Sequence, residues 1–241
     1  MSVDYDLQDR LAVVTGASRG IGRAIAVALA DAGMRVIGTG RGEAALAETR
    51  ALRPERITTR LCDLERPDDI EALVRQLHAA HERLDLLVNN AGFGTFGPAV
   101  ETSLDDWDRV FAVNARGTFH LSREVFRWMQ ETGGGRIVNI SSVVGLRGYV
   151  DQVAYSAAKH AMMGLTKVMA REGQAHGIRV AAICPGGVAT DMVRKARPDL
   201  DPAGMIQPED VARAVLFLAA MPESCCTDLI ELRRAGSTPF P

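Results

Sequence analysis

The sequence has few of the residues that build disulfide frameworks or metal centres. Its four cysteines are Cys62, Cys184 and the adjacent pair Cys225 and Cys226, and no C-x-x-C spacing occurs among the 241 residues. The five histidines form no H-E-x-x-H motif. We therefore predict no metal site, and we expect Cys62 and Cys184 to be small buried residues. A reducing, cytoplasmic setting fits this cysteine usage best.

Long apolar runs and a strong net charge are also missing. No uninterrupted apolar stretch reaches the roughly 18 residues of a membrane-spanning helix. The net charge of −2 predicts no broad electrostatic surface for nucleic acid. Residues 1–10 carry three acidic side chains and no apolar stretch, so we expect no signal peptide there. The hydrophobic fraction of 47% instead indicates an ordinary globular core.

Apolar, β-rich runs alternate with helical patterns along the whole chain. The predicted strands are 10–15, 35–39, 57–61, 84–89, 136–140, 179–183 and 228–232, and the predicted helices are 21–32, 43–52, 67–81, 104–130, 153–174 and 208–220. Apolarity within the strands is continuous, which indicates strands covered on both faces. We predict an α/β class protein with a three-layer, doubly wound Rossmann fold, in which about seven parallel strands carry helices on both faces.

No repeat, linker or low-complexity segment divides the chain, so we predict a single domain over residues 1–241. The longest stretch without clear periodicity is 186–207, and loops of this length in compact domains are often functional lids. We therefore predict a substrate lid at 186–207. Its basic residues Arg194, Lys195 and Arg197 either face solvent or meet an acidic or phosphorylated substrate.

A glycine-rich turn follows the first predicted strand and opens the first predicted helix. It reads Thr15-Gly-Ala-Ser-Arg-Gly-Ile-Gly22, with the spacing G-x3-G-x-G. Glycines let backbone N–H groups approach a pyrophosphate closely, and a helix N-terminus favours its negative charge. Tight packing alone is the alternative, but the position between strand and helix favours a dinucleotide site. The residues that would form it are Gly16, Ser18, Arg19, Gly20, Ile21 and Gly22.

The identity of the dinucleotide is predicted from the end of the second strand. An NAD-binding chain usually carries an acidic residue there, but this sequence reads Gly38-Thr-Gly-Arg41. Guanidinium groups suit a 2′-phosphate through charge-assisted bidentate bonds, and Arg19 supplies a second one. We therefore predict NADP(H) in preference to NAD(H), the alternative being that Arg41 is a solvated loop residue. Asp63, after the third strand, is positioned to accept a bond from the adenine amino group.

Two side chains that suit proton transfer lie four residues apart in Tyr155-Ser-Ala-Ala-Lys159, in a chain with only three tyrosines. This spacing places both on one face of a helix. A lysine ammonium beside a phenol favours the phenolate and lowers the tyrosine pKa from about 10. The alternative is an amphipathic residue beside a solvated charge.

These segments resemble the short-chain dehydrogenase/reductase family in its short, single-domain form, and the resemblance covers nearly the whole chain. It extends to Asn89-Asn-Ala-Gly92, Asn114, Ser142 and Pro185-Gly186 with Thr190, in the family's order. Each motif is short, but their ordered co-occurrence is specific. The resemblance is to 3-oxoacyl reductases. It implies an NADP(H)-dependent oxidoreductase that reduces a ketone or aldehyde, such as a 3-oxoacyl thioester or an apolar ketone, or oxidises a secondary alcohol.

The resemblance also implies catalytic roles. Tyr155 would be the general acid in carbonyl reduction and the general base in alcohol oxidation. Lys159 would bind the nicotinamide ribose and lower the pKa of Tyr155. Ser142 would hydrogen-bond the substrate oxygen, and Asn114 would hold a water that joins Lys159 to solvent as a proton relay.

The remaining cofactor and substrate contacts are implied in the same way. Further cofactor contacts would come from Leu64, Asn90, Ala91, Gly92, Pro185, Gly186, Val188 and Thr190. Further substrate contacts would come from Val144, Tyr149, Gln152, Gly187 and Met192. Phe93, Phe96, Leu146 and Met205 also fall where this family builds its pocket. These residues favour a largely apolar substrate, and methionines adapt to several shapes.

A non-catalytic, NADP-sensing regulator on the same fold is the alternative function. Loss of the tyrosine or lysine would be its sequence sign, and both residues are present. We expect a small-molecule substrate, no nucleic-acid or membrane partner, and a homodimer or homotetramer. Many family members end the last strand with an Asp-Gly-Gly turn, whereas residues 228–241 depart from it, which puts the tetramer in doubt.

Overall fold

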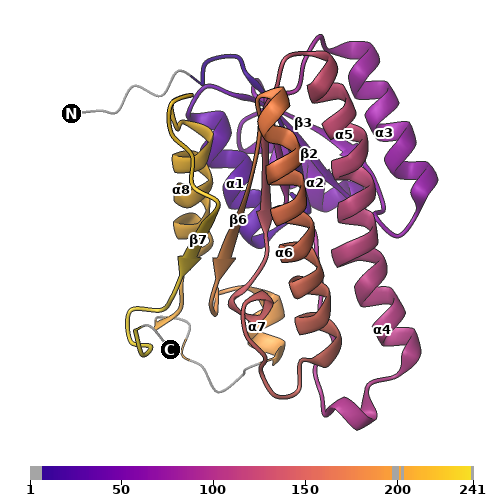
Figure 1. The fold of residues 1–241 in the computed structure, drawn as a ribbon, viewed down its shortest axis with the longest axis vertical. Coiled ribbons are helices and arrows are strands. Elements are labelled where there is room, and N and C mark those ends of the chain that lie inside the picture. Colours follow the sequence, from indigo (N-terminus) through magenta and orange to yellow (C-terminus); the bar gives the residue numbers. More distant parts are fainter. Residues whose placement is uncertain (1–6, 197–200, 202–203, 240–241) are drawn as a thin grey trace.

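A computed structural model describes residues 7–196, 201 and 204–239. Its centre is a parallel sheet of seven strands in the order β3-β2-β1-β4-β5-β6-β7 (Figure 1). The strands are β1 (Leu11–Thr15), β2 (Arg35–Gly40), β3 (Ile57–Leu61), β4 (Leu86–Asn89), β5 (Gly135–Ile140), β6 (Ile178–Pro185) and β7 (Leu229–Leu232). The predicted seven-stranded α/β fold is confirmed.

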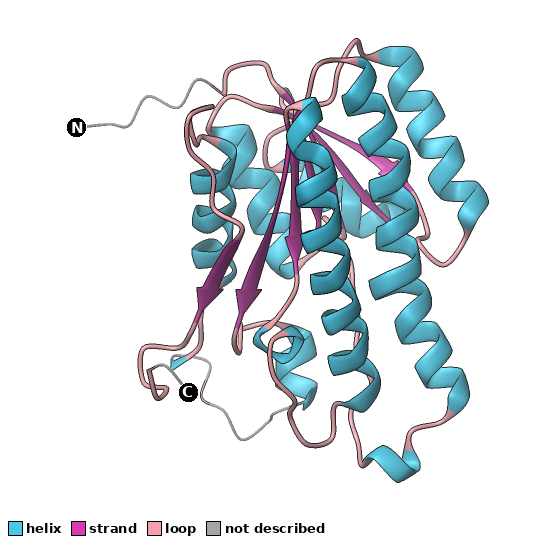
Figure 2. Cartoon of the chain, viewed as in Figure 1, coloured by secondary structure: helices cyan, strands magenta, loops and turns pink. Residues whose placement is uncertain are grey.

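Helices cover both faces of the sheet (Figure 2). One apolar cluster joins the sheet to α1 (Gly20–Asp31), α2 (Glu43–Ala51) and α8 (Pro208–Ala219). The other joins it to α3 (Pro67–Ala80), α5 (Thr118–Glu131) and α6 (Val153–Gly173). Successive β1 residues point to opposite clusters, Ala12 and Val14 to the first and Leu11 and Val13 to the second. This two-sided burial explains the continuous apolar runs.

The helix predicted at 104–130 changes geometry within its length. It consists of α4 (Leu104–Phe111), a π-helical segment η2 (Ala112–Gly117) and α5. At Gly117 a Cβ atom would lie 2.4 Å from the carbonyl oxygen of Leu64, so the helix approaches the loop after β3 where only glycine fits. The predicted helix is thus confirmed as one continuous helical run that includes a π-helical segment, and Asn114 lies within that segment.

The stretch predicted as a lid contains the short helix α7 (Asp191–Ala196). Its two ends are joined, because the Ala189 amide donates to the Ile206 carbonyl at 2.8 Å and the Ile206 amide donates to Gly187 at 3.1 Å. Arg194 is ion-paired with Asp191. Arg197 and the side chain of Lys195 lie outside the described residues.

Strand order places the candidate site. β1 pairs with β2 on one side and with β4 on the other. The strand order therefore reverses between β1 and β4, with β2 and β3 on one side and β4 to β7 on the other. Ligands of doubly wound folds bind at such a switch point, outside the carboxyl ends of the strands. The loops after β1, β4, β5 and β6 all open at this edge. None of the described helices is long and apolar enough to cross a membrane.

Candidate active site

A cleft of about 610 Å³ runs along the carboxyl edge of the sheet. It is lined by every predicted cofactor and substrate residue except for two members of the proposed substrate wall, Leu146 and Met205. Leu146 packs instead against the Met163–Cys184 cluster, and Met205 is buried. Asn114 is buried outside the lining.

The glycine turn is fastened to the end of β4. Gly16 and Gly20 have φ of +65° and +53°, which glycine adopts without strain. The Thr15 hydroxyl accepts the amides of Asn90 and Ala91, both at 3.0 Å, and Asn90 Nδ2 donates to the Thr15 carbonyl at 2.9 Å. The predicted motifs after β1 and β4 therefore form one rigid unit. Thr15 as its central acceptor was not identified from the sequence.

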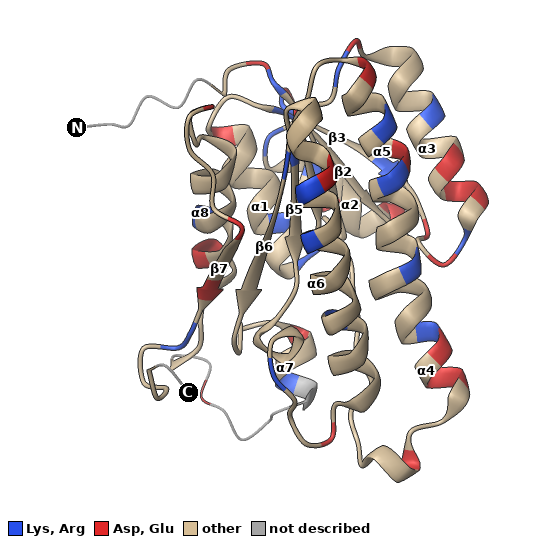
Figure 3. Cartoon of the chain, viewed as in Figure 1, with Lys and Arg blue, Asp and Glu red and all other residues tan. Residues whose placement is uncertain are grey.

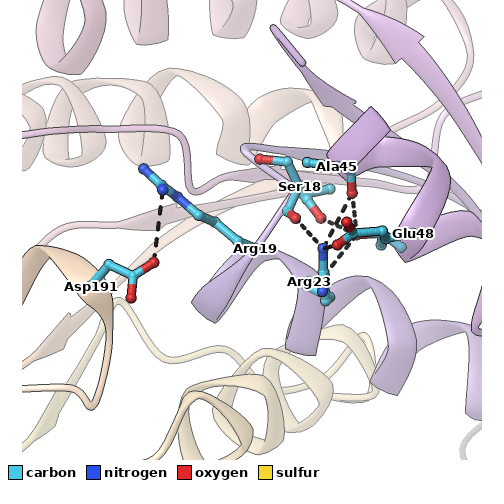
Figure 4. Close-up of polar contacts among 8 residues, drawn as sticks. Ser18, Arg19, Arg23, Ala45, Glu48 and Asp191 are labelled. Carbon is cyan, nitrogen blue, oxygen red and sulfur yellow. Dashed lines mark hydrogen bonds and ion pairs between the residues drawn. The ribbon is translucent and has the colours of Figure 1, made fainter. Parts of the chain in front are cut away.

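A second fastening comes from Arg23 on α1 (Figure 4). Its Nη2 donates to the Ser18 carbonyl at 2.6 Å and to Glu48 Oε2 at 2.8 Å, while Nε donates to the Thr49 hydroxyl at 3.0 Å. Arg23 thereby holds the turn against α2. Nothing in its sequence position distinguishes it from a solvated arginine, because its side-chain partners Glu48 and Thr49 lie 25 and 26 residues away on another helix.

The turn fits the phosphates of a dinucleotide. α1 begins at Gly20, its N-cap Arg19 makes no side-chain capping bond, and its first turn holds no acidic residue. The first amides of the helix therefore have no partner within the helix and face the cleft with the positive end of the helix dipole. At Gly22 a Cβ would lie 2.2 Å from the Gly16 carbonyl oxygen, so the turn closes this tightly only around glycine.

Two arginines line the cleft, Arg19 in the glycine turn and Arg41 after the end of β2. Arg19 Nη1 lies 3.7 Å from Asp191 Oδ2 (Figure 4), and Arg41 Nη1 lies 3.6 Å from Glu65 Oε1. Both arginine side chains are mostly exposed, so these ion pairs are worth little and leave the guanidinium groups free to reorient. Asp63 Oδ1 accepts the Glu65 amide at 3.0 Å.

The predicted catalytic side chains converge where β5 meets α6. Ser142 hydrogen-bonds with Tyr155, and its hydroxyl also lies 3.4 Å from the Pro185 carbonyl. Lys159 is buried, with Nζ 5.7 Å from the centroid of the Tyr155 ring. The edge-to-face contact of Phe96 with Tyr155, with centroids 6.0 Å apart, covers the ring from the loop after β4.

The pKa values of this pair depart from the sequence prediction. Burial raises the pKa of Tyr155 to about 12, and the hydrogen bond from Ser142 only partly opposes this. Burial also lowers the pKa of Lys159 to about 8. The predicted lowering of the Tyr155 pKa by Lys159 is therefore wrong for the protein's own groups. Lys159 Nζ donates to the Ile140 carbonyl at 2.8 Å. Tyr155 and Lys159 both lose solvation on burial, which disfavours the charged form of each.

Asn114 lies behind Gly92, next to Lys159. Its Nδ2 donates to the carbonyls of Phe93 at 2.8 Å and Val110 at 2.9 Å. Its Oδ1 is buried without a hydrogen-bond partner in the described part of the chain. A Cβ built on Gly92 would lie 2.4 Å from this oxygen and 3.6 Å from Lys159 Nζ. The orphan oxygen and the lysine therefore border the same small space.

Replacing Lys159 with methionine will change the pH dependence of stability. In wild type the pKa of Lys159 falls from its ordinary 10.5 to about 8 on folding. Below pH 8 the folded state bears the full cost of the buried charge, and above 10.5 it bears none. Urea titrations at several pH values should show that wild type gains about 3 kcal/mol relative to the variant between these limits. Lys167→Met, on the exposed side of α6, is the control. If the difference in unfolding free energy between wild type and variant does not change with pH, folding does not lower the pKa of Lys159.

Comparison with known proteins identifies the chain's relatives. Residues 10–201 match the family model of the short chain dehydrogenases. The 3-oxoacyl-[acyl-carrier-protein] reductase FabG of Vibrio harveyi is 37% identical over 226 residues, which cover 89% of this chain and 91% of that protein. The acetoacetyl-CoA reductase of Rhizobium meliloti is 39% identical over 221 residues, which cover 88% and 91%.

Solved structures give the same result. A short chain dehydrogenase from Escherichia coli CFT073 in complex with NADPH superimposes with a TM-score of 0.87 at 32% identity, covering 95% of this chain and 98% of the other. An NAD(P)-dependent gluconate 5-dehydrogenase from Beutenbergia cavernae with bound NADP has a TM-score of 0.88 at 34% identity, covering 95% and 96%.

Proposed function

Because the chain belongs to the short chain dehydrogenase family, and is thus an oxidoreductase, we propose that it reduces a ketone or aldehyde with NADPH, or oxidises a secondary alcohol with NADP⁺. The observation that carries this proposal is the convergence of Ser142, Tyr155 and Lys159 in the cleft that also holds the phosphate-fitting turn. NADPH-bound and NADP-bound relatives with closely superimposable folds support the choice of cofactor.

Tyr155 and Ser142 would manage the substrate oxygen. The cofactor, when bound, supplies the hydride. Both hydroxyls donate hydrogen bonds to the carbonyl oxygen, where negative charge develops, and Tyr155 then transfers its proton to it. With a pKa of about 12, Tyr155 is protonated at neutral pH, as an acid for reduction must be.

Lys159 and Asn114 would return the proton to Tyr155. With a pKa of about 8, Lys159 can gain or lose a proton near neutral pH. The unpartnered Asn114 Oδ1 beside it is suited to hold a water that leads to solvent. The positive ring of the oxidised cofactor would favour the phenolate and so oppose the effect of burial on Tyr155.

NADP(H) is proposed over NAD(H) because Arg19 and Arg41 flank the cleft, and no acid follows β2 directly. Arg41→Ala should raise the Kd for NADPH about tenfold, the scale of a charge-assisted hydrogen bond, and leave that for NADH within about twofold. Fluorescence titration measures both. Arg66→Ala, an exposed arginine paired with Asp69 outside the cleft, is the matched control. An equal rise in Kd for NADPH and NADH would contradict the proposed preference for NADP(H).

The substrate class is proposed from the relatives and from the wall of the cleft. The two relatives described above are named 3-oxoacyl-[acyl-carrier-protein] reductase and acetoacetyl-CoA reductase, which supports an oxoacyl thioester as substrate. Phe96, Val144, Tyr149 and Met192 line the cleft and offer an apolar surface. A panel of ketones, aldehydes and oxoacyl thioesters, followed by NADPH absorbance, tests the proposal. NADPH binding without turnover of any member would favour the alternative of a cofactor-sensing regulator.

A further inference from the structure

The cleft has a polar wall that the proposed chemistry does not use. Arg147, Glu231, Arg233 and Arg234 line it, together with the hydroxyl residues Ser237 and Thr238. They come from two places, the loop after η3 (Val143–Gly145), and strand β7 with the segment that follows it. The chain is basic just beyond the end of β7, where Arg233 and Arg234 are adjacent (Figure 3). This is the segment in which the sequence departs from the Asp-Gly-Gly turn of many family members.

Both parts of the wall are attached to the substrate end of the cleft. Ser142 is the N-cap of η3, and Arg147 lies two residues beyond the end of that helix. β7 pairs with β6, with Leu232 opposite Pro185, and the Gly186 amide donates to the Leu232 carbonyl at 2.7 Å. An ion pair of 2.6 Å between Arg147 Nη2 and Glu231 Oε1 joins the two parts. The C-terminal segment therefore begins beside the residues that hold the substrate oxygen.

The segment after β7 is folded on itself around Arg233. The Arg233 Nη1 donates to the carbonyls of Arg234 and Ala235, both at 3.2 Å, and to that of Ser237 at 2.7 Å. The Ser237 hydroxyl donates back to the Arg234 carbonyl at 2.8 Å. The Arg233 side chain thus stabilises a closed turn through its hydrogen bonds. Arg234 lies in this turn and lines the cleft.

Charge at this end of the cleft is unbalanced. Glu231 is engaged by Arg147, and Asp191 by Arg19 and Arg194. Within the part of the chain that the structure describes, the half-buried Arg234 side chain has neither an ion pair nor a hydrogen bond. An arginine held in a partly desolvated wall without a counter-ion is suited to bind a carboxylate or phosphate bidentately.

We propose that Arg234, in the same wall as the Arg147–Glu231 pair, binds an anionic group of the substrate, so that the preferred substrate is an oxo compound carrying a carboxylate or a phosphate. This inference rests on the proposed reductase function and refines it. The apolar side chains near Ser142 would contact the part of the molecule between its carbonyl and its anionic group. Cofactor binding is not part of the role assigned to Arg234.

Matched pairs of substrates test the inference. Acetoacetate and levulinate are each compared with their methyl esters, and acetoacetyl-CoA with acetoacetyl-N-acetylcysteamine, which lacks the phosphates. We expect wild type to prefer at least one anionic member in kcat/KM. The oxo-acid arm reports a carboxylate, and the thioester arm reports a phosphate. Equal kcat/KM within every pair would overturn the inference while leaving the reductase function in place.

Three variants separate charge from shape. Arg234→Ala should lower kcat/KM for the preferred anionic member about tenfold and leave its neutral counterpart, and the Kd for NADPH, within about twofold. Glu231→Gln, which removes the competing negative charge, should act in the opposite direction. Arg213→Ala, an exposed arginine of α8 paired with Asp210 outside the cleft, should change neither. A loss of NADPH affinity in Arg234→Ala would reassign this residue to the cofactor and overturn the inference.

Failure of the proposed function is distinguishable from failure of the subsite. If wild type reduces no member of any pair, the reductase function fails for these substrates. Binding of levulinate and acetoacetyl-CoA to the NADPH-saturated protein is then measured by the shift in Tm. A shift that Arg234→Ala abolishes and Arg213→Ala retains supports the subsite. No shift in wild type with either compound overturns it.

Discussion

Replacing Tyr155 with phenylalanine is expected to lower kcat for carbonyl reduction about a thousandfold or more, while the Kd for NADPH stays within about twofold of wild type. The variant loses the proton donor, and general acid catalysis alone contributes about 10²–10⁴-fold. It also loses one of two hydrogen bonds to the developing oxyanion. The phenyl ring keeps the edge-to-face contact with Phe96, so the cleft retains its shape. Single-turnover oxidation of NADPH measures the chemical step.

Tyr149→Phe is the matched control for this prediction. Tyr149 lines the same cleft but is exposed, and no hydrogen bond of its hydroxyl is part of the proposed mechanism. We expect its kcat within about threefold of wild type, because only a proton donor in contact with the substrate supplies the catalytic factor. Turnover by Tyr155→Phe at a rate close to wild type would eliminate Tyr155 as the acid. The proton would then have to come from Ser142 or from water.

The fold could be read from the sequence because its strands are buried on both sides. In β1, Leu11 and Val13 pack against one helix layer, and Ala12 and Val14 pack against the other. Every residue of such a strand is buried, so the strand is visible in the sequence as an uninterrupted apolar run. The π-helical segment within the helix at 104–130 could not be predicted from the sequence. Its last residue, Gly117, approaches Leu64 closely, and this contact exists only once the two segments are folded together.

The candidate site was predictable where a motif is local. The glycine turn and the Tyr155–Lys159 pair each lie within a few consecutive residues, and all of these predicted residues line the cleft. Arg23, Arg147 and Glu231 were not singled out, because each acquires its meaning from a partner far away in the sequence. The catalytic and binding roles of the residues predicted from the sequence stay predictions, as do the oligomeric state and the location in the cell.

The pKa of Tyr155 shows a second limit of sequence reasoning. Spacing of four residues predicts that a lysine charge lies near the phenol, but it does not predict how much water either group loses. In the structure desolvation is the largest influence on both residues, raising one pKa and lowering the other. Proximity alone therefore gave the wrong direction.

Replacing Gly22 with alanine is expected to raise the Kd for NADPH about a thousandfold, and the Kd for NADH by a similar factor. The added Cβ would lie 2.2 Å from the Gly16 carbonyl oxygen and 2.5 Å from Asn90 Nδ2, so the turn must open. Opening displaces the backbone amides that would bind the pyrophosphate, and loss of two such hydrogen bonds to a charged group costs about 3–6 kcal/mol. Because both cofactors contain the pyrophosphate, the ratio of their Kd values should not change, in contrast to Arg41→Ala.

Gly164→Ala separates this local effect from the general effect of adding a methyl group to a helical glycine. Gly164 is exposed within α6, and a Cβ there meets no atom within 4 Å. We expect this control to bind NADPH as wild type does and to gain up to about 1 kcal/mol in stability. Gly22→Ala should lose about 1–3 kcal/mol through overpacking, so cofactor titrations are made well below its Tm. Tight NADPH binding by a folded Gly22→Ala protein would show that the pyrophosphate does not lie against the glycine turn.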